Sequence, residues 1–274
     1  MHSRAISGIA MLAILTTLSA CTPLRTTTPG TVGIKRSGLM LVSSSQMNNM
    51  ANSNYEQTLR AAAARGALNK NPTQLASLRA IGKRLATQTA VFRVDAPSWD
   101  WQFNLIHEPT LNAWCMPGGK IVFYSGIIDQ LQLSSDEIAA IMGHEIAHAL
   151  REHGRERVSQ QLLSQVGMDL LTIYSKANRQ QLNQMGDIVK YGWLLPNSRE
   201  QESESDRMGV ELAARAGFNP KAAVRVWEKM RKQQQSEVPE WQSTHPAHET
   251  RISELQVYAE KVWPLYETAR KRKT

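Results

Sequence analysis

Apolar residues recur every three or four positions along most of this chain, which is the period of an α-helix with one buried face. Between residues 101 and 124 the period changes to two, because Trp101, Phe103 and Leu105 alternate with polar neighbours. The pattern therefore predicts an α+β fold that is mostly helical and contains one small β-sheet. The helical stretches are residues 47–65, 72–88, 134–150, 198–217 and 247–270, with two weaker ones between residues 155 and 195 and one that begins at Asn219-Pro220.

The small sheet is expected to contain three strands, at residues 101–105, 111–116 and 120–124. Residues 117–119, Pro-Gly-Gly, have the composition of a tight turn between the second and third strands. The next helix has a clear beginning, because Ser134 is followed three residues later by a glutamate, the spacing of a capping box. A capped, amphipathic helix is thus expected directly after the sheet.

The first twenty residues have the pattern of an export signal. A positive start with Arg4 precedes the apolar residues 5–18, which are too few to span a bilayer. Leu-Ser-Ala-Cys at residues 18–21 then resembles the bacterial lipoprotein box, which implies cleavage before Cys21 and acyl chains at that residue. The alternative is an ordinary cleaved signal with an incidental cysteine. Because Thr22 rather than aspartate follows, the resemblance points to the outer membrane and its periplasmic face.

Three parts of unequal length are expected along the 274 residues. Residues 1–20 are the signal peptide, and residues 21–45 are a flexible tether in which Thr, Pro and Gly are frequent. Residues 46–274 form a single domain, since a hydrophobic content of 42% supports one sizeable core. No later segment is apolar enough to span a membrane, so we expect a periplasmic domain held to the membrane by lipid on Cys21.

The formal net charge of +8 favours anionic partners but does not choose among them. The dense basic run is residues 270–273, which is typical of a solvated tail. No interleaved aromatic pattern or nucleic-acid-binding motif accompanies it, and an exported protein does not meet nucleic acid. Nucleic acid is therefore not an expected partner.

The strongest chemical signal is His144-Glu145-Ile146-Ala147-His148. On a helix, positions i and i+4 share a face, so both imidazoles can reach one metal ion. Glu145 lies beside that face, where it can contact a water on the metal without being a ligand. The alternative is a pair of unrelated histidines at helical spacing, which the capped, amphipathic context disfavours.

A catalytic zinc ion needs a third protein ligand and an open position. His153 lies five residues after His148, so on a continuous helix its side chain would point away from the ion. A histidine near a helix C-terminus, favoured there by the helix dipole, is the simpler interpretation of His153.

Residues 198–206 offer several carboxylates for the third ligand. Glu202 and Asp206 share a helix face, so Glu202 could bind the metal while Asp206 accepts a hydrogen bond from a ligand histidine. Glu200 and Glu204 share a different face and are interpreted as solvated charge. Spacing alone favours Glu202 as the third ligand only modestly.

Four ordered motifs add to this reading. They are His-Glu-x-x-His-x-x-x-x-His-x-x-x-Arg at residues 144–157, Ser-Arg-x-x-Glu-x-x-x-Asp at 198–206, Asn-Ala-Trp-Cys-Met-Pro-Gly-Gly at 112–119, and Ser-Thr-His-Pro at 243–246 followed by Arg-Ile at 251–252. Together they resemble the gluzincin family of zinc metallopeptidases that includes the heat-shock protease HtpX, the CAAX prenyl protease and the periplasmic protease BepA. Trp114 and Cys115 depart from the commonest residues of that family.

The resemblance covers about residues 75–257 and implies a zincin-like metallopeptidase domain with the sheet beside the active-site helix. With the lipoprotein box included, the sequence is most similar to the small lipoprotein members of that family, such as LoiP. The resemblance implies one zinc ion per chain, held by His144, His148 and Glu202. Asp206 would support a ligand histidine, and Glu145 would be the general base.

Peptide hydrolysis also needs a donor for the oxyanion and a place for the substrate. His245 is the first candidate donor and Arg251 a weaker one. The strand that contains Asn112, Ala113 and Trp114 is expected to bind an extended peptide through backbone hydrogen bonds.

The function predicted is a zinc endopeptidase that acts on misfolded or misassembled envelope proteins, as the family resemblance implies. Cys115 is interpreted as a packed thiol, because no histidine partner pattern for a nucleophile surrounds it. The competing hypothesis is a non-catalytic lipoprotein with structural zinc. Glu145 argues against that hypothesis, since a structural site needs no general base.

Overall fold

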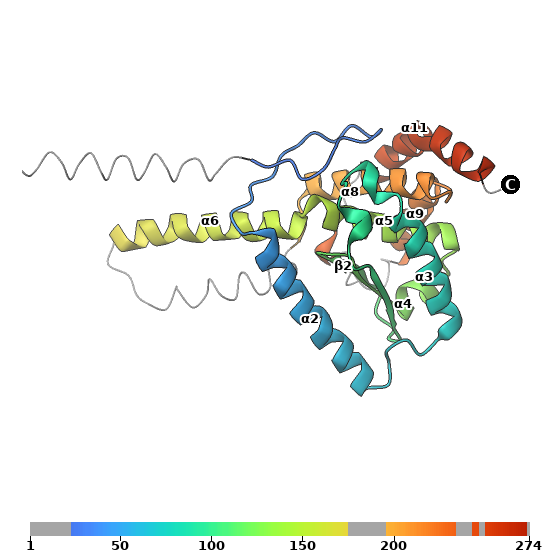
Figure 1. The fold of residues 1–274 in the computed structure, drawn as a ribbon, viewed down its shortest axis with the longest axis horizontal. Helices are drawn as coiled ribbons and strands as arrows, with labels where there is room; N and C mark the ends of the chain where they lie inside the picture. Colours follow the sequence, from blue (N-terminus) through green and yellow to red (C-terminus); the bar gives the residue numbers. More distant parts are fainter. Residues whose placement is uncertain (1–22, 175–195, 234–242, 247–249, 273–274) are drawn as a thin grey trace, which may run out of the picture.

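The computed structural model describes residues 23–174, 196–233, 243–246 and 250–272 (Figure 1). Its three-stranded sheet contains β1 (Gln102–Ile106), β2 (Ala113–Met116) and β3 (Lys120–Tyr124) in the order β1-β3-β2. β3 pairs with β1 in parallel and with β2 in antiparallel orientation, so β2 lies at an edge of this described sheet. The expected turn between β2 and β3 contains Gly118 and Gly119 at φ +78° and +84°, values that favour glycine.

Helices make up most of the remainder, which confirms the predicted α+β class. The cap expected at Ser134 forms, and the side chains of Asn71, Ser134 and Ser198 each accept a hydrogen bond from a backbone N–H group of the helix that they precede. The second half of the weak helical region, residues 175–195, lies outside the described residues. The helices are α2 (Ser44–Ala64), α3 (Pro72–Ala86), α4 (Ser125–Gln130), α5 (Ser135–Arg151), α6 (His153–Tyr174), α8 (Arg199–Arg215), α9 (Ala222–Gln233) and α11 (Arg251–Lys271), with short 3₁₀ turns η2 (Thr89–Val91) and η3 (Ala96–Ser98).

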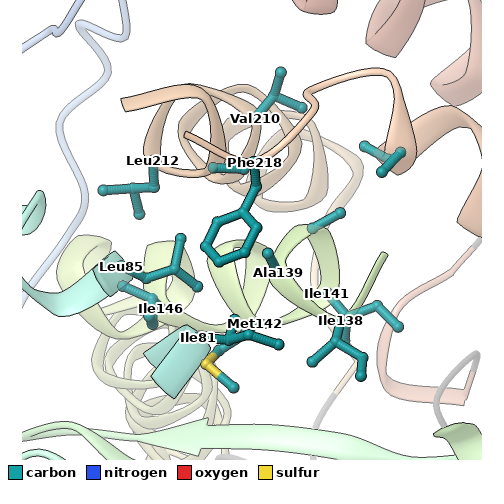
Figure 2. Close-up of a cluster of buried hydrophobic side chains, with 14 of the residues drawn as sticks. Ile81, Leu85, Ile138, Ala139, Ile141, Met142, Ile146, Val210, Leu212 and Phe218 are labelled. Carbon is teal, nitrogen blue, oxygen red and sulfur yellow. The ribbon is translucent and has the colours of Figure 1, made fainter. Parts of the chain in front are cut away.

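Helix α5 is the centre of the fold and is buried along nearly its whole length. It packs on β2 and α3 and also contacts α8, α9 and the start of α6, while α11 packs across α8 and α9. Figure 2 shows apolar side chains of α5 packed with those of α3 and of α8 and the turn after it: Ile138, Ala139, Ile141, Met142 and Ile146 from α5, Ile81 and Leu85 from α3, and Val210, Leu212 and Phe218. This packing holds α5 rigidly against both neighbours.

The two faces of the sheet are covered by different helices. Phe103, Leu105 and Phe123 belong to the main core around α3 and α5, whereas Ile106 and Val122 point to the other face. That second face packs against α2, through a smaller apolar cluster that includes residues 51, 55 and 62. The alternation seen in the sequence is therefore between two buried faces rather than between core and solvent.

The segment before α2, residues 23–43, packs on the domain. Val32 and Ile34 are buried in the main core, and the Val32 N–H donates to Glu211 Oε2 over 3.0 Å. Leu24 and Gly38 form an isolated antiparallel bridge within the segment. This part of the expected flexible tether is therefore docked, because two buried apolar residues fix it to the core.

None of the helices within the described ranges combines the length and the apolarity that crossing a membrane requires. Figure 1 shows α6 projecting from the body of the fold. Helix α2 runs along the sheet, and α11 lies on the side of α8 that is away from the sheet.

Candidate metal centre

Two histidines of α5 form the first half of the site. His144 and His148 are buried, and their Nε2 atoms lie 3.0 Å apart. This is the i, i+4 geometry that the sequence predicts, and it depends on the capped start and buried faces of α5. Burial holds the pKa of His148 well below its ordinary value, which favours the neutral imidazole that a metal ligand requires.

Helix α8 supplies a carboxylate to the same point. Glu202 is fully buried, with Oε1 3.3 Å from His148 Nε2 and Oε2 3.5 Å from His144 Nε2. Burial raises the pKa of the Glu202 carboxyl, but nearby His245 and Arg251 outweigh this effect and keep the pKa well below its usual range. The carboxylate is therefore ionised, as a metal ligand must be.

His245 completes the cluster from a bend that directly follows the helical residues 243–244. Its Nδ1 lies 3.2 Å from His144 Nε2 and 3.0 Å from Glu202 Oε1, and its Nε2 lies 3.4 Å from Glu145 Oε1. The backbone N–H and side-chain amide of Asn197 both bond to the Thr244 carbonyl over 3.0 Å, and this holds the loop in place.

The four side chains have the composition and spacing of a zinc site. One ligand atom from each of His144, His148, Glu202 and His245 lies within 4.8 Å of every other. The neighbouring donor atoms are 3.0–3.5 Å apart, close to the edge of about 3.3 Å that a tetrahedron of zinc ligands has. Among the described residues, Glu202 Oε2 accepts no hydrogen bond of good geometry, although Arg251 Nη1 is an ion-pair partner at 2.7 Å. The imidazoles of His144 and His148, the Glu202 carboxylate and His245 as a further donor therefore form a set that fits zinc.

Asp206 and Arg251 form a layer behind the cluster. His144 Nδ1 lies 3.0 Å from Asp206 Oδ1, and Arg251 donates to both Asp206 oxygens from Nε and Nη2 over 2.8 and 2.7 Å. This is the role that spacing suggested for Asp206. Arg251 is 1% exposed and packs with its guanidinium over the Trp227 ring. The suggested oxyanion role of Arg251 does not fit this position, because its guanidinium is engaged with Asp206 and Glu202 behind the ligands.

His153 and Glu204 take positions that sequence reasoning missed. His153 is fully buried, and its Nδ1 lies 2.9 Å from His148 Nδ1. Its Nε2 lies 3.1 Å from Glu204 Oε2, so Glu204 is a buried partner rather than solvated charge. The extrapolation of one continuous helix was wrong because Glu152 adopts φ +55°, which ends α5 and begins α6 in a new direction.

A cavity of about 350 Å³ opens beside the cluster. Its lining includes Glu145, His148 and His245 of the centre, together with Asn112 and the whole of β2. The expected substrate strand therefore borders the same space as the expected base. Cys115 also lines the cavity, and burial raises the pKa of its thiol, consistent with a protonated, packed side chain.

Three further cavity residues were not expected from the sequence. Asn54 and Thr58 of α2 form part of its wall, and Arg157 of α6 reaches it from another side. Burial lowers the pKa of Arg157 to about 10, which still leaves the guanidinium charged at neutral pH. Arg157 was visible as the last residue of the first motif, whereas nothing in the pattern of α2 distinguished Asn54 and Thr58 from its other polar residues.

A model of peptidase family M48 matches residues 72–259 of the chain. The chain belongs to peptidase family M48. The resemblance inferred from the four motifs is thereby confirmed, and so is the metallopeptidase type of fold. Members of this family use zinc, which is the metal that the donor set favours. The segment before α2 and α2 itself lie outside the matched residues.

Curated relatives come from bacteria and from mitochondria. The chain is 31% identical over 159 residues to the mitochondrial metalloendopeptidase OMA1 of Schizosaccharomyces pombe, a match that covers 57% of this chain and 46% of that protein. It is 26% identical over 198 residues to the beta-barrel assembly-enhancing protease of Escherichia coli, which covers 69% of this chain and 39% of that protein. The chain thus spans less than half the length of these M48 relatives.

Proposed function

We propose that this M48 chain is a zinc-dependent endopeptidase that hydrolyses misfolded or misassembled envelope proteins. The observation that carries the proposal is the position of Glu145, buried beside the cluster of His144, His148 and Glu202 and lining the adjacent cavity. A structural zinc site has four protein ligands and no need of a carboxylate beside an open cavity.

The proposed ligands are His144, His148 and Glu202, which come from two helices held by core packing. Bound zinc lowers the pKa of a coordinated water and polarises a carbonyl oxygen. Glu145 accepts the proton of the attacking water at its carboxylate and delivers it to the leaving amine. Asp206 holds His144 in the orientation in which Nε2 faces the metal.

The proposed substrate path follows β2. Within the described sheet, β2 pairs with β3 alone and so is an edge strand, and residues 112–116 line the cavity. An extended peptide that pairs with Ala113 and Trp114 would be bound mainly through its backbone, which suits unfolded proteins of varied sequence. Asn112 orders the start of the strand, since its side-chain oxygen accepts from the Ala113 N–H over 2.8 Å.

His245 is proposed to occupy the open coordination position in the resting protein and to move toward the oxyanion when peptide binds. Its Nδ1 lies among the donor atoms of the cluster, and it belongs to a loop rather than to a helix. A loop side chain can change position at lower cost than Glu202, whose helix is packed on α5.

We further propose that the domain is held at the periplasmic face of a bacterial outer membrane by lipid on Cys21, a residue outside the described part of the chain. The lipoprotein box and the name of the beta-barrel assembly-enhancing protease support an envelope location. The name of the OMA1 relatives supports the endopeptidase activity, although those proteins are mitochondrial.

Zinc content and casein digestion test the proposal together. The purified protein should contain one zinc ion per chain and digest casein, and Glu202→Ala should lose both properties. Glu200→Ala is the matched control, because Glu200 is an exposed carboxylate of the same helix turn, and it should retain both. A protein that holds zinc but leaves casein intact would favour the non-catalytic scaffold, and a protein without zinc would contradict the proposal outright.

A further inference from the structure

We propose that His153 is a positioning residue that fixes the tautomer and orientation of His148 through a buried chain of contacts, Glu204–His153–His148. The inference rests on the proposed zinc site, in which His148 is a ligand. It extends that site to two residues beyond the ligands and their direct carboxylate partner.

The Glu204–His153–His148 contacts have the geometry of two consecutive hydrogen bonds. His148 Nδ1 and His153 Nδ1 are 2.9 Å apart, and His153 Nε2 is 3.1 Å from Glu204 Oε2. Ser205 Oγ also lies 3.3 Å from His153 Nδ1. The His153 side chain is fully buried and Glu204 is 6% exposed, so neither group can exchange its partner for bulk water.

Two arginines keep Glu204, the residue farthest from the metal site in this series of contacts, in its carboxylate form. Arg151 donates to Glu204 Oε2 from Nε and Nη2 over 3.1 and 3.0 Å. Arg36 donates from Nε to Oε1 and from Nη2 to Oε2, each over 3.0 Å. A carboxylate that accepts from two guanidinium groups carries no proton and can only accept from His153.

The Glu204 carboxylate fixes the position of each proton along the Glu204–His153–His148 contacts. Because Glu204 can only accept, His153 Nε2 carries a proton, and in the neutral ring Nδ1 is then an acceptor. His148 must donate from Nδ1 to that acceptor, which leaves the lone pair on His148 Nε2. Nε2 is the atom that faces His144 and Glu202. The chain therefore presets His148 in the one tautomer that can bind a metal at that point.

The two ligand histidines are thus oriented by different means. His144 contacts the carboxylate of Asp206 directly, whereas His148 reaches Glu204 through the ring of His153. The αL conformation of Glu152 makes this possible, because it turns the start of α6 so that His153 lies back against the C-terminal turn of α5. Partners of this kind typically contribute about ten- to hundredfold to metal affinity.

The test measures zinc affinity by chelator competition in His153→Phe, which keeps ring volume but removes both nitrogens, and in Glu204→Gln, which keeps shape but removes the charge. Both should bind zinc about ten- to hundredfold more weakly than the wild type. Glu156→Gln is the matched control, because it removes the charge of another buried partner of Arg36. Glu156 bonds to Arg36 and Gln201 but not to the histidine pair. Its zinc affinity should equal that of the wild type.

Nitrogen-15 NMR of the histidine side chains in the metal-free wild type gives a second readout that does not depend on any variant folding. The predicted spectrum has the proton on Nδ1 of His148 and on Nε2 of His153. The inference is overturned if His148 carries its proton on Nε2, or if a folded His153→Phe binds zinc as tightly as the wild type. A wild type that binds no zinc would instead overturn the proposed function, and the inference with it.

Discussion

Gly143 of α5 and Gly209 of α8 face each other where the two helices cross, directly beside the metal centre. A Cβ added to Gly209 would lie 2.7 Å from the His144 backbone nitrogen, and one added to Gly143 would lie 2.8 Å from the Gly209 carbonyl oxygen. Both neighbours are backbone atoms of packed helices, which cannot move aside cheaply. The close crossing places Glu202 and Asp206 within reach of the histidines of α5.

Gly209→Ala should therefore weaken both the fold and zinc binding. The added methyl group forces the helices apart, and overpacking of this kind typically costs about 1–3 kcal/mol. Thermal and urea unfolding of the metal-free protein measure the first effect, and chelator competition measures the second. Gly154→Ala is the control for unfolding, because the nearest heavy atom to its added Cβ is 3.9 Å away. Equal stability of the two variants would contradict this reading of the crossing.

The segment before α2 should contribute to stability through Arg36. This side chain pairs with Glu156 and Glu204, both of which are buried. Arg36→Met should lower the free energy of unfolding by about 1.5–3 kcal/mol, since hydrogen bonds to charged groups are lost at buried partners. Arg60→Met removes an exposed pair with Glu56 and should change stability by less than about 1 kcal/mol. Urea unfolding of the two metal-free variants compares them directly, and a similar small loss in both would show that the segment is not anchored by Arg36.

The local features of the site were predictable from the sequence because they depend on short-range rules. The helical spacing of His144 and His148, the caps of α5 and α8 and the three strands follow from periodicity and capping. The shared face of Glu202 and Asp206 also follows from helical geometry. Spacing alone could not show that Glu202 and Asp206, rather than Glu200 and Glu204, face the two histidines.

Other features depend on long-range packing, which leaves no periodic trace. His153 was assigned to the wrong direction because a single αL residue, Glu152, redirects the chain. The segment of Val32 and Ile34 has no regular period, because two isolated apolar residues are enough to dock an irregular stretch. Arg36 joins this segment to carboxylates more than a hundred residues away, and pairing at that distance is not readable from one sequence.

His245→Ala should leave zinc and fold in place and change turnover. If His245 mainly occupies the open position, the variant should be faster than the wild type, and if it mainly supports the oxyanion it should be slower. Kinetics with titrated active sites, measured beside thermal melts, separates these roles from a purely structural one. A lower melting temperature with unchanged turnover per folded molecule would remove His245 from the mechanism.

Cys21 should be the first residue of the mature protein and should carry acyl chains. Mass spectrometry of protein purified from membranes measures the mass of the N-terminal peptide. Cys21→Ser should block lipid attachment and normal processing, because a hydroxyl cannot replace the thiolate as the nucleophile that accepts the diacylglyceryl group. An unmodified N-terminus at another position in residues 22–36 would contradict the anchoring proposal.

We propose that Glu145 is the general base of a zinc peptidase and is not a ligand. Glu145→Gln keeps the shape of the side chain but removes its ability to accept a proton, and general-base catalysis typically contributes about a hundred- to ten-thousand-fold. The deciding measurement is the rate of casein digestion by this variant, with its zinc content determined on the same sample. We expect one zinc ion per chain and a rate reduced at least about a hundredfold. Digestion at the wild-type rate by the zinc-loaded variant would contradict this proposal.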